Sequence, residues 1–153
     1  MVSVQAVADY ILASVDVSKG DSITNLKLQK LVYYAQAWHL VSLGEPLFAE
    51  DIQAWAHGPA VYPLWKRFSD CGWHAIPTDE VVDRALIGSI PPASAQVIDS
   101  VLEAYSHLSA VELEDLTHAE DPWLVTRQGL QPDESSNRVI EHALMTEFYV
   151  NAQ

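Results

Sequence analysis

The hydrophobic and polar positions of this 153-residue chain alternate mostly with the period of an α-helix, and the longest such pattern covers residues 22–43. On a helix the apolar side chains of this segment fall in two arcs, one of Leu28, Leu31, Val32, Ala35, Trp38 and His39, the other of Leu26, Tyr33, Ala37 and Leu40. A narrow polar strip of Asn25, Gln29 and Gln36 separates them. A helix that is apolar around most of its circumference is normally surrounded by other elements. We therefore expect residues 22–43 to form a central core helix.

Five further segments carry apolar residues at helical spacing. They cover residues 3–15, 61–70, 94–105, 109–120 and 133–148. Ser94 is an expected N-cap, and Ser109 with Glu112 has the spacing of a capping box. Asp121-Pro122 is expected to end the helix before it, and the last helix is expected to begin at Asp133 or Ser135.

Glycine and proline divide the rest of the chain. His57-Gly58-Pro59 is a firm break, because Gly58 can take a positive φ and Pro59 lacks an amide donor. Residues 51–55 fit a short extended piece or a helical turn, and residues 71–92 fit a loop with a small hairpin or helical turn. The sequence thus predicts a mainly α-helical single domain over residues 1–153, with five or six helices around the central one and room for a small β element.

The charge balance narrows the choice of partners. Eight Lys and Arg against twenty-one Asp and Glu give a net charge of −13, which disfavours nucleic-acid binding. A helix-turn-helix is disfavoured as well, since the candidate recognition helix after Gly58 offers only Lys66 and Arg67. The acidic surface suits either simple solvation or a basic partner protein.

Other features indicate where the protein acts. No apolar run is long enough for a membrane span, and the N-terminus has no signal-peptide pattern. The single cysteine, Cys71, agrees with a reducing compartment. We expect a cytoplasmic protein without a membrane partner.

The usual constellations of catalysis and ligand binding are missing from the sequence. No two of the six His stand three or four residues apart on an expected helix, and His39 fits a buried core histidine. Cys71 and His74 are close in sequence, but an inert thiol is the better interpretation of Cys71. The chain has no nucleophile elbow, Walker loop or dinucleotide fingerprint. We expect no metal, no cofactor and no enzymatic activity.

Polar and aromatic residues also occur where a plain core does not require them. Three polar residues stand early on the central helix, namely Lys27, Gln29 and Lys30. Five others gather around two tight turns, namely Trp55, His57, Tyr62, Trp65 and Trp123. Trp and Tyr carry much of the binding energy at protein interfaces. The alternative is that each Trp simply fills the core.

Several of these residues belong to a recognisable pattern. It consists of LKLQKLVYYAQAW at 26–38 (the helix motif), PLF at 46–48, AWAHGP at 54–59 (the Gly-Pro motif) and THAEDPW at 117–123 (the Pro-Trp motif). In this order the segments resemble the Panacea domain, an antitoxin-associated family that includes SocA-like and phage-associated GepA-like proteins. The visible departure is Ala60, where the family commonly has Val, a small change in volume.

The resemblance implies a mostly α-helical domain without established enzymatic activity, which neutralises a toxin usually encoded beside it. Panacea domains accompany many unrelated toxins, so the identity of the toxin does not follow. Taken with the polar and aromatic residues described above, the candidates for partner binding are Lys27, Gln29, Lys30, Trp55, His57, Tyr62, His118 and Trp123. The implied structural positions are Leu31, Trp38, Gly58, Pro59 and Pro122.

Three functions therefore remain open. The first is an antitoxin that binds and blocks a cognate protein toxin. The second is an adaptor that delivers the toxin to a cellular AAA+ protease, as the SocA-like resemblance suggests. The third is a small enzyme that uses His57 or His118 with nearby acids. Oligomeric state, and the division of the candidates between fold and interface, also stay open.

Overall fold

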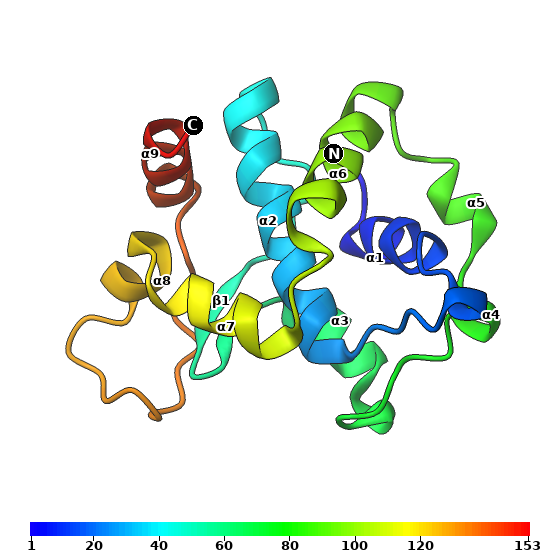
Figure 1. Ribbon diagram of the computed structural model, residues 1–153. Helices are drawn as coiled ribbons and strands as arrows, with labels where there is room; N and C mark the ends of the chain where they lie inside the picture. The colour runs from blue at the N-terminus through cyan, green and yellow to red at the C-terminus, as the bar shows by residue number, and fades with distance from the viewer.

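Helix α2 (Asn25–Leu43) runs through the centre of the computed structural model, which describes residues 1–153 (Figure 1). The Thr24 hydroxyl caps its start by accepting from the Lys27 amide. Gly44 ends it with a φ of +74°, a conformation that costs glycine little. Leu31 is fully buried and Trp38 is half-buried, so the expected central core helix is confirmed.

Four longer helices pack on α2. They are α1 (Val4–Ala13), α6 (Pro92–Tyr105), α7 (Ala110–His118) and α9 (His142–Asn151). Figure 1 shows α9 and α6 on opposite sides of α2, with α1 beyond α6. The mainly α-helical fold is thereby confirmed, and no helix is both long enough and apolar enough to cross a membrane.

Short helices fill the connections. These are α3 (Tyr62–Arg67), α4 (Thr78–Val81), α5 (Arg84–Ile87) and α8 (Asp121–Thr126), with 3-10 turns at Val17–Lys19 and Ser69–Cys71. Helix α8 was not expected. Pro122 stands in its first turn, where the missing amide hydrogen is no loss. The same proline that keeps α7 from continuing therefore starts a new helix.

The small β element is a hairpin of β1 (Gln53–Trp55) and β2 (Gly58–Ala60), paired antiparallel with Trp55 opposite Gly58. The other edge of β1 pairs with residues 138–140, because Ala54 N donates to Arg138 O at 2.8 Å and Ile140 N to Ile52 O at 2.8 Å. The expected start of the last helix at Asp133 or Ser135 is therefore wrong, and α9 begins at His142.

The expected N-cap at Ser94 is also wrong. Helix α6 begins at Pro92, whose fixed φ suits the first helical position. Ser94 lies within the first turn, with its hydroxyl 2.9 Å from His39 Nε2. The other ring nitrogen of His39 lies 2.6 Å from Glu45 O. His39 is thus the buried core histidine that the sequence predicted.

The polar strip on α2 is buried, and it binds backbone groups of the loop before the hairpin and of α3 after it. Gln36 accepts from Leu47 N at 2.7 Å and donates to Phe48 O at 2.8 Å. Asn25 donates to Trp65 O at 3.1 Å. Buried backbone groups outside regular structure need such partners. The strip therefore fixes the chain before and after the hairpin against the core helix.

Candidate functional site

The helix motif, the Gly-Pro motif and the Pro-Trp motif meet at the β1–β2 hairpin. The Gly-Pro motif forms the hairpin itself, and the helix motif on α2 lies along its β2 side. The Pro-Trp motif contacts β2 from α7 and reaches β1 through Trp123 of α8. Residues far apart in the sequence therefore build one structural unit.

Two side chains of α2 close the free edge of β2. Pro59 O accepts from Lys30 Nζ at 3.0 Å, and Val61 N donates to Gln29 Oε1 at 2.8 Å. An uncapped strand edge leaves such groups without partners or open to a foreign strand. The adjacent Gln29 and Lys30 thus have a common structural task, which is to fix the strand after the turn.

Gly58 is required by this arrangement. Its φ is +104°, and a Cβ there would lie 2.6 Å from Lys30 Cε and 3.0 Å from Thr117 Oγ1. No side chain larger than hydrogen fits without displacing a buried neighbour. The glycine therefore lets the Lys30 side chain pass directly against the hairpin.

Lys30 is only 1% exposed. No carboxylate lies within 4.0 Å of its ammonium nitrogen, since the ion pairs of the structure join other residues. Burial lowers the pKa of Lys30 to about 7, although the negative charge of Glu114 acts in the opposite direction. The positive charge of a protonated Lys30 therefore has no ion-pair partner within the protein.

The Pro-Trp motif holds the hairpin from the other side. Trp123 Nε1 donates to Trp55 O at 2.8 Å, and the His118 ring stacks on Trp123 with centroids 4.0 Å apart. Desolvation lowers the pKa of His118, and its Nε2 is buried without a hydrogen-bond partner. His118 is thus packed beside the indole as part of this support.

Arg127 also supports the hairpin, and the sequence analysis did not identify it as a site residue. Its Nη1 donates to Ala54 O at 2.8 Å, and its guanidinium lies 5.1 Å from the Trp123 ring centre. The available signal was its position four residues after Trp123, which places both side chains on one helical face.

The acid of the Pro-Trp motif attaches the C-terminal helix. Glu120 Oε1 accepts from Tyr34 at 2.7 Å and from Tyr149 at 2.8 Å, joining α2 and α9. Burial raises the pKa of Glu120, while these hydrogen bonds act against the rise. Glu120 is therefore a structural acid.

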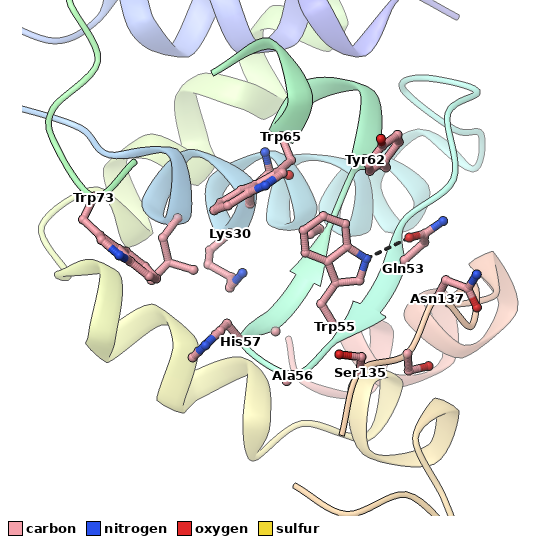
Figure 2. Close-up of a pocket in the computed structure, with 15 residues that line it drawn as sticks. Lys30, Gln53, Trp55, Ala56, His57, Tyr62, Trp65, Trp73, Ser135 and Asn137 are labelled. Atoms are coloured by element: carbon pink, nitrogen blue, oxygen red, sulfur yellow. Dashed lines mark hydrogen bonds between the residues drawn. The ribbon is translucent and has the colours of Figure 1, made fainter. Parts of the chain in front are cut away.

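Beside the hairpin lies a pocket of about 820 Å³, called the aromatic pocket below (Figure 2). Its lining consists of Leu26, Gln29, Lys30, Gln53, Trp55, Ala56, His57, Gly58, Ala60, Tyr62, Trp65, Trp73, Ser135, Ser136 and Asn137. Trp55 stands 5.7 Å from Trp65 and 6.4 Å from Tyr62 between ring centres, and its indole N–H donates to Gln53 at 2.8 Å. Figure 2 shows Lys30 reaching between Trp65, Trp55 and His57 toward the hairpin.

The rim of the aromatic pocket is exposed. Trp73 is 67% exposed and Tyr62 is 52% exposed. His57 Nδ1 lies 2.9 Å from Glu114 Oε1, with the imidazole side chain 69% exposed. Large aromatic surface open to water beside a supported hairpin is typical of a binding site.

The structure divides the expected partner-binding residues into three groups. Trp55, His57 and Tyr62 line the aromatic pocket, with Gln29 and Lys30 at its floor. His118 and Trp123 lie behind the hairpin and support it. Lys27 is not brought to this site, because its Nζ donates to Ser106 O at 2.6 Å.

Trp65 was noticed in the sequence but not chosen as a candidate, and Trp73 was missed. Trp73 lies in the segment 71–92, whose structure the sequence did not define, and a Trp in a glycine-containing loop was its only signal. The pocket offers aromatic ring faces and hydrogen-bond donors, which are groups suited to binding a partner or ligand. No group of three or more His, Cys, Asp or Glu is placed to hold a metal ion.

Comparisons with known proteins place this arrangement in a family. The family model described as antitoxin SocA-like, Panacea domain, matches residues 28–124, which include the hairpin and the Pro-Trp motif. Antitoxin SocA of Caulobacter vibrioides (strain NA1000 / CB15N) is 34% identical over 140 residues, covering 84% of this chain and 72% of that protein. No solved structure matches the chain. The chain belongs to the antitoxin SocA-like family of Panacea-domain proteins.

Proposed function

We propose that this protein is an antitoxin that neutralises a cognate protein toxin by binding it directly at the aromatic pocket. Family membership and the relative named as an antitoxin support the antitoxin role. We place the toxin-binding surface at the aromatic pocket because Trp73 and Tyr62 are exposed at its rim.

The rim of the aromatic pocket offers a partner a large apolar area next to a pre-organised hairpin. Trp and Tyr bury much apolar surface with few rotatable bonds, which is why they dominate interface energetics. The hairpin beneath them is fixed by Gln29, Lys30 and Trp123. A partner that binds there would lose little free energy to ordering this surface.

The charge of the chain supports a protein partner with a basic surface. A net charge of −13 speeds encounter with such a partner and disfavours nucleic acid. Neutralisation by direct binding needs no catalytic step, cofactor or metal. We place the protein in the cytoplasm, with its toxin encoded by an adjacent gene.

The test is co-expression with the adjacent open reading frame. The parent chain should restore growth and co-purify with the toxin. A variant with Tyr62→Ala and Trp73→Ala should lose both effects, with affinity reduced about tenfold or more. A matched control with Val17→Ala and Val150→Ala removes exposed apolar side chains that do not line the pocket, and it should behave as the parent.

Toxin half-life separates sequestration from proteolytic delivery. A stable complex with an unchanged toxin half-life supports direct neutralisation. Restored growth without a complex, together with a shortened toxin half-life, would contradict the proposal and favour an adaptor for a AAA+ protease. An adjacent gene product that does not impair growth would remove the basis of the antitoxin role.

A further inference from the structure

The Lys30 ammonium at the floor of the aromatic pocket is left with unused donors. A lysine ammonium has three N–H groups. The hydrogen bond from Lys30 Nζ to Pro59 O uses one of them. No carboxylate lies within 4.0 Å, and Glu114, the charge that acts on it, is bonded to His57. A buried ammonium without an ion-pair partner is costly to maintain, and for this reason burial lowers the pKa of Lys30 to about 7. An anion beside Lys30 would stabilise its charged form.

The walls of the pocket carry further donors that the protein does not use. Trp55 donates its indole N–H to Gln53, whereas the indoles of Trp65 and Trp73 and the amide of Asn137 have no partner within the chain. The ring faces of the same residues supply flat apolar surface. A ligand with acceptor oxygens and a flat body would satisfy both.

The sign of charge in the pocket is opposite to that of the protein. The chain has twenty-one acidic residues, yet none of them lines the aromatic pocket. Its titratable lining residues besides Tyr62 are Lys30 and His57, both basic. A cation would suit the ring faces, but it would meet these two groups with no acid in the lining.

We propose that the aromatic pocket binds a carboxylate attached to a flat apolar body. The carboxylate supplies Lys30 with its missing ion-pair partner, and the apolar body lies between the Trp and Tyr rings. The volume of about 820 Å³ is within the range of small-ligand sites and admits a group of one or two fused rings. This inference rests on the geometry of the pocket and is independent of the antitoxin role.

The test uses 2-naphthoate as the probe and 2-naphthamide as its neutral match, below about pH 7, where Lys30 is mostly protonated. It uses the full chain, isothermal titration calorimetry and NMR of the indole N–H groups. The naphthoate should bind about tenfold or more tightly than the amide. Its binding should shift the Trp65 and Trp73 indole signals. Equal binding of both probes, or binding of neither at millimolar concentration, would overturn the proposal.

Two variants locate the binding. Lys30→Gln keeps a donor but removes the charge, so it should abolish the preference for naphthoate over the amide. Trp73→Ala should weaken both probes, and because Trp73 is exposed this variant decides the question if Lys30→Gln fails to fold. Naphthoate binding that neither variant changes would place the probe elsewhere and refute the site.

Competition with the toxin identifies the source of the carboxylate. Displacement of the toxin by naphthoate assigns the natural carboxylate to the toxin. Binding of naphthoate to the intact complex assigns it to a free small molecule, and it would also contradict the proposed docking of the toxin at this pocket. Both results support a carboxylate site.

Discussion

The buried lysine makes the stability of this protein depend on pH in a direction that can be measured. Burial lowers the pKa of Lys30 from 10.5 to about 7. Between these two values the unfolded chain holds a proton that the folded chain has released. The free energy of unfolding therefore rises with pH through this window, because the folded state is no longer burdened by a buried charge.

The size of this rise in unfolding free energy follows from the single proton that Lys30 releases on folding. Each pH unit in this window is worth about 1.4 kcal/mol, so the rise from about pH 7.5 to about pH 9.5 is about 3 kcal/mol. Lys27 adds a smaller slope of the same sign, since desolvation lowers its pKa as well. Measurements should stop below pH 10, where tyrosines begin to ionise in the unfolded chain.

Lys30→Met isolates the effect, because Met has a similar length and no charge. At pH 7.5 the variant loses the bond to Pro59 O, a cost of about 1 kcal/mol that the removal of the buried amine offsets. Its unfolding free energy should then stay nearly constant as the pH rises, apart from the slope that Lys27 contributes.

Urea unfolding of both chains at three pH values in this window tests the reasoning. The difference in unfolding free energy between parent and variant should grow by about 3 kcal/mol toward pH 9.5. Identical slopes for the two chains would show that Lys30 keeps its ordinary pKa in the folded state. The account of the pocket floor would then be wrong.

Three further predictions concern the fold around the site. Gly58→Ala should cost about 3 kcal/mol by urea unfolding, because its Cβ would collide at 2.6 Å with a buried side chain, whereas Gly129→Ala has a similar positive φ with open space and should cost about 1 kcal/mol. Equal costs would refute the collision. Trp123→Phe should lose about 1 kcal/mol and speed amide exchange in β1, because the bond to the hairpin backbone disappears; unchanged exchange would show that this bond does not hold the hairpin. Asp9→Asn breaks an ion pair of 2.7 Å with Arg67, in which the carboxylate is buried and the guanidinium partly exposed, and it should cost about 3 kcal/mol. Asp16→Asn, in an exposed pair of 3.8 Å with Lys19, should cost less than about 0.5 kcal/mol. Similar losses for the two Asp variants would contradict the assigned burial.

Features that depend on neighbouring residues were predictable from the sequence. The capping box of Ser109 and Glu112 is present, and Ser3, the first residue of the expected helix over residues 3–15, caps α1. Helix α2 ends at Leu43, where the expected range 22–43 also ends. Each of these needs only side chains within a few positions of one another, so the local pattern contained the information.

Features that depend on distant pairing were not predictable. Val139 and Ile140 fit a helical stripe with the residues after them, but pairing with β1 makes them extended. Ser94 looks like an N-cap, yet its hydroxyl lies against a histidine 55 positions away. Tertiary contacts override local preference at both places.

The candidate site shows the same division. Lys30, Gly58 and Trp123 were identified from the sequence motifs. Only the fold shows that Lys30 passes directly against Gly58 and that the Trp123 indole binds the hairpin backbone. Trp73 enters the pocket from a loop that no pattern defined. Exposure, which separates rim from support, is a property of the packed structure alone.

Amide hydrogen exchange of the protein alone and in complex with its toxin tests the central claim most directly. Direct binding at the aromatic pocket should slow exchange in residues 53–62 and 65–74, which contain the hairpin and the rim aromatics. Helices α1 and α6 should change little. Protection confined to α1 or α6, with the hairpin and rim unchanged, would place the toxin on another surface and contradict the account.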